Sequence, residues 1–418
     1  MPATVLAYAA PLAKARLREA GFTVITQGPA QHDAVVVDDA GRTVLEAQSL
    51  ANMARGRSAI PVIALGDTLA SAVGFDAVAP ADAPPALLRA RIEQALRVAA
   101  LEEEAGVRAA ALATFGLAAP PVWRAEPSVA PPRVLVVGSP SRHLMALSGA
   151  LEALGAVVGA SLTTFTAFDH LHNTAFDACA MCGIDDIETA SAFVSTLRRN
   201  AALYHLPCAV VLADIEASGL MFERGADEVI ITREAPEPAA QRLLRLAQIR
   251  RRRDAARNRF ARMRLPSVVD TASSLHTGAF MAACIDARRA MRPDAIQAIG
   301  VLRLIEDSAS ATLSRFGALD SALAQAGAMA DRLVRAEDLA ARLDATTFAV
   351  LTAVGGRSAA EAAARRIAAV LECSAWPTGE TGRPASLAFA CAACEITSDA
   401  DGAAFVDRAR RLLETRRA

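Results

Sequence analysis

One pattern constrains the fold more than any other: short apolar runs alternate with amphipathic segments, and the alternation occurs twice along the chain. The runs are rich in Val, Ile, Leu and Ala, and the segments between them are long enough for covering helices. Strands that alternate with helices in this way form parallel sheets buried on both faces. The two copies agree in order and spacing, which indicates an internal duplication. We therefore predict two tandem doubly wound α/β domains, over residues 1–105 and 132–255.

A proline-rich stretch, LAAPPVWRAEPSVAPP, separates the two copies. Proline removes a backbone donor and interrupts helices, so this stretch is predicted to be a linker. After Pro266 the pattern changes to longer helical segments around three apolar runs, IGVLRLIED, FAVLTAV and SLAFACAACEI. Residues 266–418 are therefore predicted to form a third domain of the α+β class.

The seven cysteines are an odd number in a long chain, which argues against a disulfide framework and fits a reducing compartment. Two CxxC pairs occur, Cys179 with Cys182 and Cys391 with Cys394, and both lie in apolar runs expected to be strands. Side chains three positions apart on a strand point to opposite faces of the sheet. We therefore predict core cysteines in preference to a metal or redox site.

Charge and hydropathy restrict the partners. The formal net charge of -1 gives no general attraction to nucleic acid or to a membrane surface. The arginine-rich run Arg250–Arg264 is interrupted by Asp254 and Asn258, which favours the solvated face of a helix over nucleic-acid binding. No apolar run reaches the roughly 18 residues of a membrane span, and no leader of the secretory type is visible. We expect a cytoplasmic protein with no nucleic-acid partner and no membrane insertion.

Both N-terminal modules resemble the receiver domains of response regulators, in which an aspartate ending the third strand accepts a phosphoryl group. In HDAVVVDD the predicted strand brings Asp38 to that place, whereas FDACAMC has Cys182 there. Receivers also need an acidic pair for Mg²⁺ and a lysine after the fifth strand, but residues 8–10 are Tyr-Ala-Ala, residues 138–140 are Gly-Ser-Pro, and Lys14 is the only lysine. Without Mg²⁺ the transfer loses electrostatic assistance. Asp38 is therefore a candidate phosphoacceptor, with a solvated loop acid as the alternative.

The third domain resembles the GGDEF family, the diguanylate cyclases that condense two GTP molecules into cyclic di-GMP on a nucleotide-cyclase-type fold. The resemblance is carried by RAEDLAARLDATTFAVL, residues 335–351, in which an RxxD motif precedes the signature hairpin at the family's offset. Residues 344–348, Asp-Ala-Thr-Thr-Phe, occupy the place of the Gly-Gly-acid-Glu-Phe signature. Together with the tandem receivers, the resemblance covers nearly the whole chain.

The residues that the family uses for catalysis are replaced. Ala345 adds a Cβ where glycine lets the backbone approach a triphosphate, and Thr346 and Thr347 remove the carboxylates of the signature. Arg303 stands at the metal-binding aspartate, and Leu313 is near the place of the asparagine that recognises guanine. Phosphoryl transfer depends on charge neutralisation by a metal. We therefore expect no enzymatic activity, no catalytic residue, no metal and no cofactor.

What is retained is Arg335 and Asp338, at the offset of the family's inhibitory product-binding site. In that site the arginine contacts phosphate and guanine through its planar fork, and the aspartate accepts hydrogen bonds from guanine. Arg366 matches a secondary arginine of the site, with Arg365 as the alternative register. RxxD alone is a weak motif, because such pairs also form surface ion pairs and residues 251–254 contain another.

The resemblance therefore implies a non-catalytic receptor whose ligand is cyclic di-GMP. It further implies a homodimer that acts as an adaptor, presenting protein partners to a protease machine during the cell cycle, at a cell pole. Two alternatives stay open. One is a receiver scaffold controlled by phosphorylation of Asp38 without nucleotide binding, and the other is a divergent diguanylate cyclase.

Overall fold

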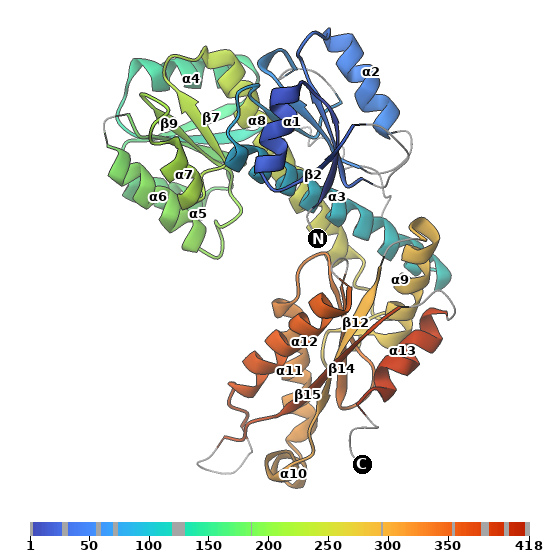
Figure 1. The fold of residues 1–418 in the computed structure, drawn as a ribbon. Coiled ribbons are helices and arrows are strands. Elements are labelled where there is room, and N and C mark those ends of the chain that lie inside the picture. The colour runs from blue at the N-terminus through green and yellow to red at the C-terminus, as the bar shows by residue number, and fades with distance from the viewer. Residues whose placement is uncertain are drawn as a thin grey trace. The chain divides into compact units, whose positions relative to one another are not determined.

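The computed structural model describes residues 3–26, 32–55, 60–69, 74–118, 130–184, 186–293, 296–352, 356–377, 384–396 and 401–413. The chain divides into two compact units. The first unit contains Met1–Ala99 and Arg124–Ala255, and the second contains Ala100–Trp123 and Ala256–Ala418. Each unit is therefore built from two stretches of sequence, and each is described separately below (Figure 1).

The first module of the first unit is a parallel sheet with the strand order β2-β1-β3-β4-β5. All five residues of β3 are buried, because helices cover both faces of the sheet. Helix α2 packs on one face and helices α1 and α3 on the other. The elements are β1 (Thr4–Tyr8), α1 (Pro11–Glu19), β2 (Thr23–Ile25), β3 (Ala34–Asp38), α2 (Val44–Arg55), β4 (Val62–Leu65), the 3-10 helix η1 (Asp67–Leu69), β5 (Ala77–Ala79) and α3 (Pro85–Thr114).

The second module repeats this topology, with the order β10-β9-β8-β6-β7. Read from β7, this is the same 2-1-3-4-5 order as in the first module, which is one of the common doubly wound orders. Helices α4 and α8 cover one face, and α5, α6 and α7 cover the other. The elements are β6 (Arg133–Val137), α4 (Arg142–Ala153), β7 (Val157–Ser161), α5 (Thr164–Asn173), β8 (Ala178–Cys182), α6 (Ile187–Arg199), β9 (Cys208–Leu212), α7 (Ser218–Arg224), β10 (Glu228–Ile231) and α8 (Pro236–Arg262). The predicted pair of doubly wound domains is confirmed.

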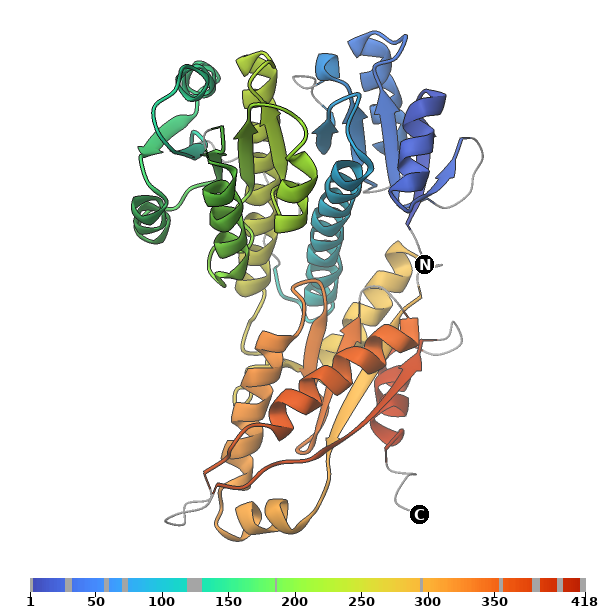
Figure 2. The same cartoon turned by 60° about the vertical axis from the view of Figure 1, so that its left-hand side comes forward.

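The second unit contains a mixed sheet with the order β11-β13-β14-β12-β15, in which β12 runs antiparallel to both β14 and β15. Helices α9 and α13 cover one face, and α11 and α12 cover the other (Figures 1 and 2). The elements are β11 (His276–Thr277), α9 (Gly278–Met291), β12 (Ala298–Leu304), α10 (Ser308–Arg315), α11 (Leu319–Leu333), β13 (Leu339–Arg342), β14 (Thr347–Thr352), α12 (Gly356–Glu372), β15 (Phe389–Glu395) and α13 (Gly402–Arg411). This is the predicted α+β domain.

Helix α3 contributes to both units. The division falls after Ala99, inside the helix, and Val107, Ala111 and Leu112 are fully buried in the core of the second unit. Helix α8 is divided in the same way after Ala255. Most of the stretch predicted to be a linker, residues 119–129, lies outside the described residues.

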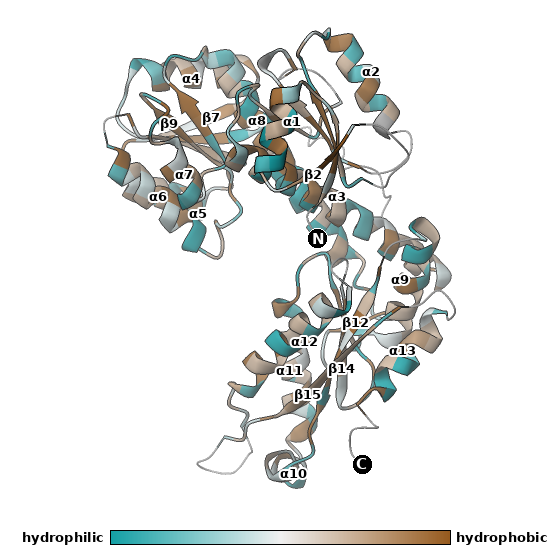
Figure 3. Cartoon of the chain, in the orientation of Figure 1, coloured by the Kyte–Doolittle hydropathy of each residue, from teal (hydrophilic) through white to brown (hydrophobic). Residues whose placement is uncertain are grey.

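The cysteine prediction is confirmed by the side-chain positions. Cys179 packs in the core on the α5–α7 face of its sheet, and Cys182 packs against the core on the opposite face. Cys391 and Cys394 likewise contact the cores on opposite faces of the third sheet, where burial raises the pKa of both thiols to about 11. The strands are coloured largely hydrophobic in Figure 3, as expected for sheets that are covered on both faces.

The arginine-rich part of α8 is held by carboxylates of the first unit. Arg251 makes two hydrogen bonds to Asp177, at 2.9 and 2.7 Å, and Arg252 Nη1 lies 2.8 Å from Asp76 Oδ1. The second RxxD sequence, at residues 251–254, therefore has its arginine committed to an ion pair. Among the described residues, no helix is both long and apolar enough to cross a membrane.

A buried charge cluster joins the two modules of the first unit. Arg91 of α3 and Arg242 of α8 both reach Glu228 at the start of β10, with nitrogen to Oε2 distances of 2.6 and 3.4 Å. All three side chains are almost completely buried, and Glu234 also pairs with Arg242. Buried charges need such partners, because removing one leaves the others desolvated and unpaired. The cluster therefore ties the two modules together as well as filling their shared core.

Candidate functional site

The retained RxxD motif forms the turn between α11 and β13. The Asp338 N–H donates to the Arg335 carbonyl O at 3.1 Å, which closes the turn. Arg335 is exposed, whereas Asp338 is only 8% exposed. The turn therefore presents an arginine to solvent beside a buried aspartate.

Arg366 of α12 lies beside this turn. Its Nη2 donates to the carbonyl O of Leu333, the last residue of α11, at 3.2 Å. A cation at this position is favourable because the last carbonyls of a helix carry a partial negative charge. Arg365, one position earlier, pairs with Glu361 of its own helix at 2.6 Å. The structure thus brings Arg366 to the chain segment that leads into Arg335, and it directs Arg365 elsewhere.

The turn has a further partner that the sequence did not reveal. Nη2 of Arg108, on α3, donates to the carbonyl O of Asp338 at 2.9 Å and is 3.4 Å from that of Ala336. The two partners are separated by 230 positions in the chain. No local motif marks Arg108, and only the tertiary structure identifies it.

The hairpin between β13 and β14 explains why this signature lacks glycine. The Thr346 N–H donates to Asp344 Oδ1 at 2.9 Å, and the Leu343 N–H donates to the Thr347 carbonyl O at 2.9 Å. Among the described residues other than glycine, only Ser274 has a positive φ, so no residue of this turn needs the left-handed region. The Asp344 side chain organises an Asx-type turn in place of the geometry that glycine would supply.

An arginine fastens the same hairpin. Arg342 donates to the carbonyl O atoms of Asp344 and Ala345, at 3.2 and 3.0 Å, and to Asp270 Oδ1 at 3.2 Å. Partial burial raises the pKa of Asp270, but hydrogen bonds from Ser273 and Arg342 outweigh it and hold that pKa below its usual range. Asp270 is therefore an ionised anchor for Arg342, and the turn's carbonyl groups are occupied by protein donors.

The positions that correspond to metal and guanine ligands have changed chemistry. Arg303 of β12, which the resemblance equates with a metal-binding aspartate, stands opposite Thr347 in the strand register. Thr347 is fully buried, and Leu313 is fully buried in the apolar core with no polar side-chain atom for a base. Within the described ranges, no group of three or more His, Cys, Asp and Glu side chains is placed to hold a metal ion.

Asp38 lies at the end of β3, at the place predicted for the phosphoacceptor. It is only 4% exposed, which corrects the alternative of a solvated loop acid. Its Oδ1 is 2.5 Å from Arg42 Nη1, and its Oδ2 accepts a hydrogen bond from the Ala10 N–H. The charge of Asp38 is thus met by an arginine of the loop that follows β3, beside a cavity of about 120 Å³.

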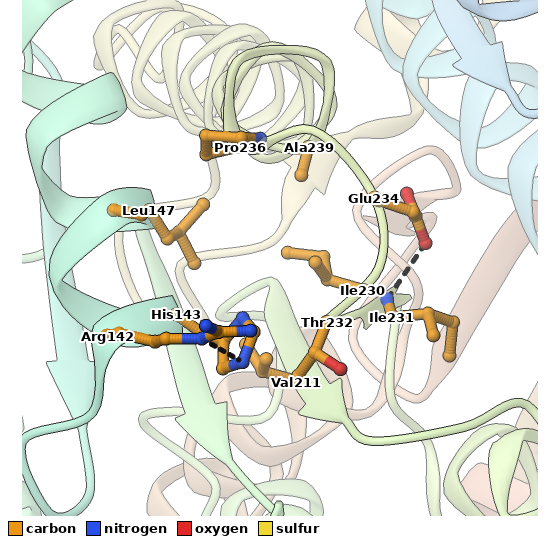
Figure 4. Close-up of a pocket in the computed structure, with 11 residues that line it drawn as sticks. Arg142, His143, Leu147, Val211, Ile230, Ile231, Thr232, Glu234, Pro236 and Ala239 are labelled. Atoms are coloured by element: carbon orange, nitrogen blue, oxygen red, sulfur yellow. Dashed lines mark hydrogen bonds between the residues drawn. The ribbon is translucent and has the colours of Figure 1, made fainter.

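A separate cavity of about 310 Å³ lies in the second module, between α4 and α8 (Figure 4). Leu147, Val211 and Ile230 line its apolar part, whereas Arg142 and His143 form a polar side, with Arg142 Nε 3.2 Å from His143 Nε2. None of the predicted ligand-binding residues lines this cavity. It is therefore a feature of the second module, independent of the RxxD turn.

Comparisons with known proteins add context. No family model matches the chain, and no curated protein matches it. Similar solved structures include the GGDEF domain of DgcB from Caulobacter crescentus in complex with c-di-GMP, with 14% identity over 37% of this chain and 89% of that chain and a TM-score of 0.33. The FimX GGDEF domain from Pseudomonas aeruginosa matches with 19% identity, over 36% of this chain and 95% of that chain, with a TM-score of 0.30. A response regulator from Thermotoga maritima matches with 20% identity, over 28% of this chain and 98% of that chain, with a TM-score of 0.26.

These TM-scores are below 0.5, so the class of the protein rests on the strand orders given above. Two parallel five-stranded sheets with the 2-1-3-4-5 order define two doubly wound α/β modules of the flavodoxin-like type. The mixed five-stranded sheet that follows belongs to a third domain, of the α+β class. The chain thus contains two tandem doubly wound α/β modules and a C-terminal α+β domain.

Proposed function

We propose that this protein is a receptor for cyclic di-GMP, which it binds through Arg335, Asp338 and Arg366 without synthesising it. The observation that carries the proposal is the position of Arg366 at the end of α11, where its guanidinium lies beside the segment that leads into the RxxD turn. Cyclic di-GMP has two phosphates and two guanine bases. Two arginines and a carboxylate are the groups that bind such a ligand by charge-assisted hydrogen bonds.

The absence of catalysis is part of the proposal. Arg303 places positive charge where a metal ligand is needed, and the carbonyl groups of the hairpin turn are bonded to Arg342. A triphosphate and its Mg²⁺ would have to displace these contacts without carboxylate ligands. Purified protein incubated with GTP and Mg²⁺ should therefore form no cyclic di-GMP. Accumulation of product would favour the divergent cyclase instead.

Calorimetric titration with cyclic di-GMP tests binding directly. The wild type should bind, and Arg335→Ala should lose about 2 kcal/mol, or more than tenfold in affinity, because a charge-assisted contact is removed. Arg365→Ala is the matched control, since Arg365 is an exposed arginine of α12 that pairs with Glu361. Absence of binding by the wild type would refute the proposal.

The adaptor role in regulated proteolysis is the output that the resemblance suggests for such a receptor. It would appear as cyclic di-GMP-dependent degradation of a client protein in a reconstituted protease assay. The scaffold alternative depends on Asp38, which the structure places at the end of β3 but pairs with Arg42.

A further inference from the structure

The backbone of the RxxD turn is held by a side chain from a distant part of the chain. Arg108 Nη2 donates to the Asp338 carbonyl O at 2.9 Å and lies 3.4 Å from the Ala336 carbonyl O. Both carbonyl groups belong to the peptide planes of the turn that carries Arg335. Holding the two carbonyl groups in one orientation restricts the backbone of the turn, because each peptide unit is planar and only two dihedrals per residue can vary.

Arg108 is itself immobilised. Its Nε donates to Glu104 Oε1 at 2.7 Å, and its guanidinium lies 4.2 Å from the centre of the Phe260 ring. Glu104 is only 1% exposed and is also bonded to Arg288 of α9. A buried arginine in such a network cannot change rotamer without leaving a charge or a donor unpaired. Because the Arg108 guanidinium is held in place, its hydrogen bond to the Asp338 carbonyl O also restricts the backbone of the turn.

Apolar packing supports the same contact. Ala336, inside the turn, packs against a cluster formed by Leu101 and Ala105 of α3 and by Ala256 and Phe260 of α8. All of these residues belong to the second unit. The turn is thus seated on two helices by both polar and apolar contacts.

We propose that Arg108 is a positioning residue of the cyclic di-GMP site, and that the site is completed by α3 residues 101–112. The inference rests on the proposed function, because it assigns a role within that same site. A turn that is already fixed loses less conformational freedom when it binds a ligand. Coupling between two elements is reciprocal, so a ligand on the turn must in turn stabilise the α3 segment.

Binding measurements give the first test. Cyclic di-GMP affinity should fall about tenfold in Arg108→Ala and by a smaller factor in Arg108→Gln, which retains an amide donor. Arg97→Ala is the matched control, because Arg97 is an exposed arginine of α3 paired with Glu93 at 3.0 Å, and it should bind like the wild type. Wild-type affinity in Arg108→Ala, together with loss in Arg335→Ala, would overturn the inference and leave the proposed function intact. Absence of binding by the wild type would overturn both.

Hydrogen exchange gives a second test that does not depend on a variant that folds. Adding cyclic di-GMP to the wild type should slow exchange in peptides from 335–342 and also in peptides from 101–112. A side chain that only supported the fold would give no ligand-dependent protection in α3. Slower exchange confined to residues 335–342 would show that the ligand does not stabilise residues 101–112, and it would overturn the inference.

Discussion

Arg366 Nη2 donates to the carbonyl O of Leu333 at 3.2 Å, a contact between residues 33 positions apart that joins α12 to the end of α11. The bond places one guanidinium group two residues before Arg335 in the chain. Its neighbour Arg365 faces Glu361 and is 70% exposed at its side chain. Adjacent arginines of one helix therefore have different surroundings. This difference favours Arg366 over Arg365 as the secondary arginine of the site.

Arg366→Ala should weaken cyclic di-GMP binding by about 1.5 kcal/mol, roughly tenfold, because a charged donor to phosphate is lost. Arg365→Ala should leave the affinity unchanged. Calorimetric titration of the two variants in the same buffer decides between them. The reverse result would assign the secondary arginine to position 365.

The cluster around Glu228 should carry much of the stability of the first unit. Glu228→Gln removes the carboxylate shared by Arg91 and Arg242, and the loss should be about 3 kcal/mol because two buried cations lose a partner. Urea unfolding followed by hydrogen exchange of β9 and β10 peptides measures this loss. Glu93→Gln is the control, since Glu93 forms an exposed pair with Arg97 and should change stability by less than about 1 kcal/mol.

His276 should make the second unit sensitive to acid. Burial lowers the pKa of this imidazole to about 3, with Arg108 and Arg264 contributing in the same direction. Nδ1 lies 3.3 Å from the Val268 carbonyl O, whereas Nε2 has no partner in the described structure, so a second proton would be buried without an acceptor. The unfolded chain takes up that proton near pH 6.5 and the folded chain only near pH 3. Stability from this group is therefore complete above about pH 6.5 and is lost as the pH falls toward 3.

The expected loss from His276 alone is about 2 kcal/mol between pH 7 and pH 5. Chemical unfolding of the wild type and of His276→Asn over this pH range measures it, because asparagine does not titrate. The stability of the variant should depend less steeply on pH. Parallel curves for the two proteins would show that folding does not shift the pKa of His276.

Asp38 should not be labelled by a small phosphodonor in the presence of Mg²⁺. Its carboxylate is buried and engaged by Arg42 and the Ala10 N–H, and residues 8–10, Tyr-Ala-Ala, supply no acidic pair for the metal. Intact-protein mass spectrometry after incubation with acetyl phosphate provides the measurement. A phosphoryl adduct that disappears in Asp38→Asn would instead support the phosphorylation-controlled scaffold.

The glycine-free hairpin should depend on the Asp344 side chain. Asp344→Ala removes the acceptor of the Thr346 N–H and should destabilise the second unit by about 1 kcal/mol. Asp344→Asn keeps a side-chain oxygen in the same place and should have a much smaller effect. Thermal unfolding of the two variants makes the comparison, and equal losses would show that the turn does not rely on this acceptor.

The sequence predicts those features that depend on local pattern. Alternating apolar runs are sufficient for both doubly wound sheets, and the two-residue period of a strand places Cys179 and Cys182 on opposite faces. The offset between Arg335 and the hairpin likewise lies within one short segment. Each of these inferences compares residues that are close in the chain.

Long-range features could not be predicted in this way. The helical pattern of α3 is continuous over 30 residues, so nothing local marks the change of unit after Ala99. The contact of Arg108 with the turn spans 230 positions, and the hydrogen bond from the Ala10 N–H to Asp38 joins residues 28 positions apart. Such contacts are fixed by tertiary packing, which a single sequence does not display.

Because the second unit is built from two separate stretches of sequence, a truncation that isolates it must keep both. Since Ala100–Trp123 belongs with Ala256–Ala418, the segment between them interrupts the sequence of the second unit. A truncated protein starting at Pro266 would lack Glu104. Arg288 would then be a buried cation without its carboxylate partner. A deletion that joins residue 123 to residue 256 keeps that carboxylate, and it should yield a folded fragment.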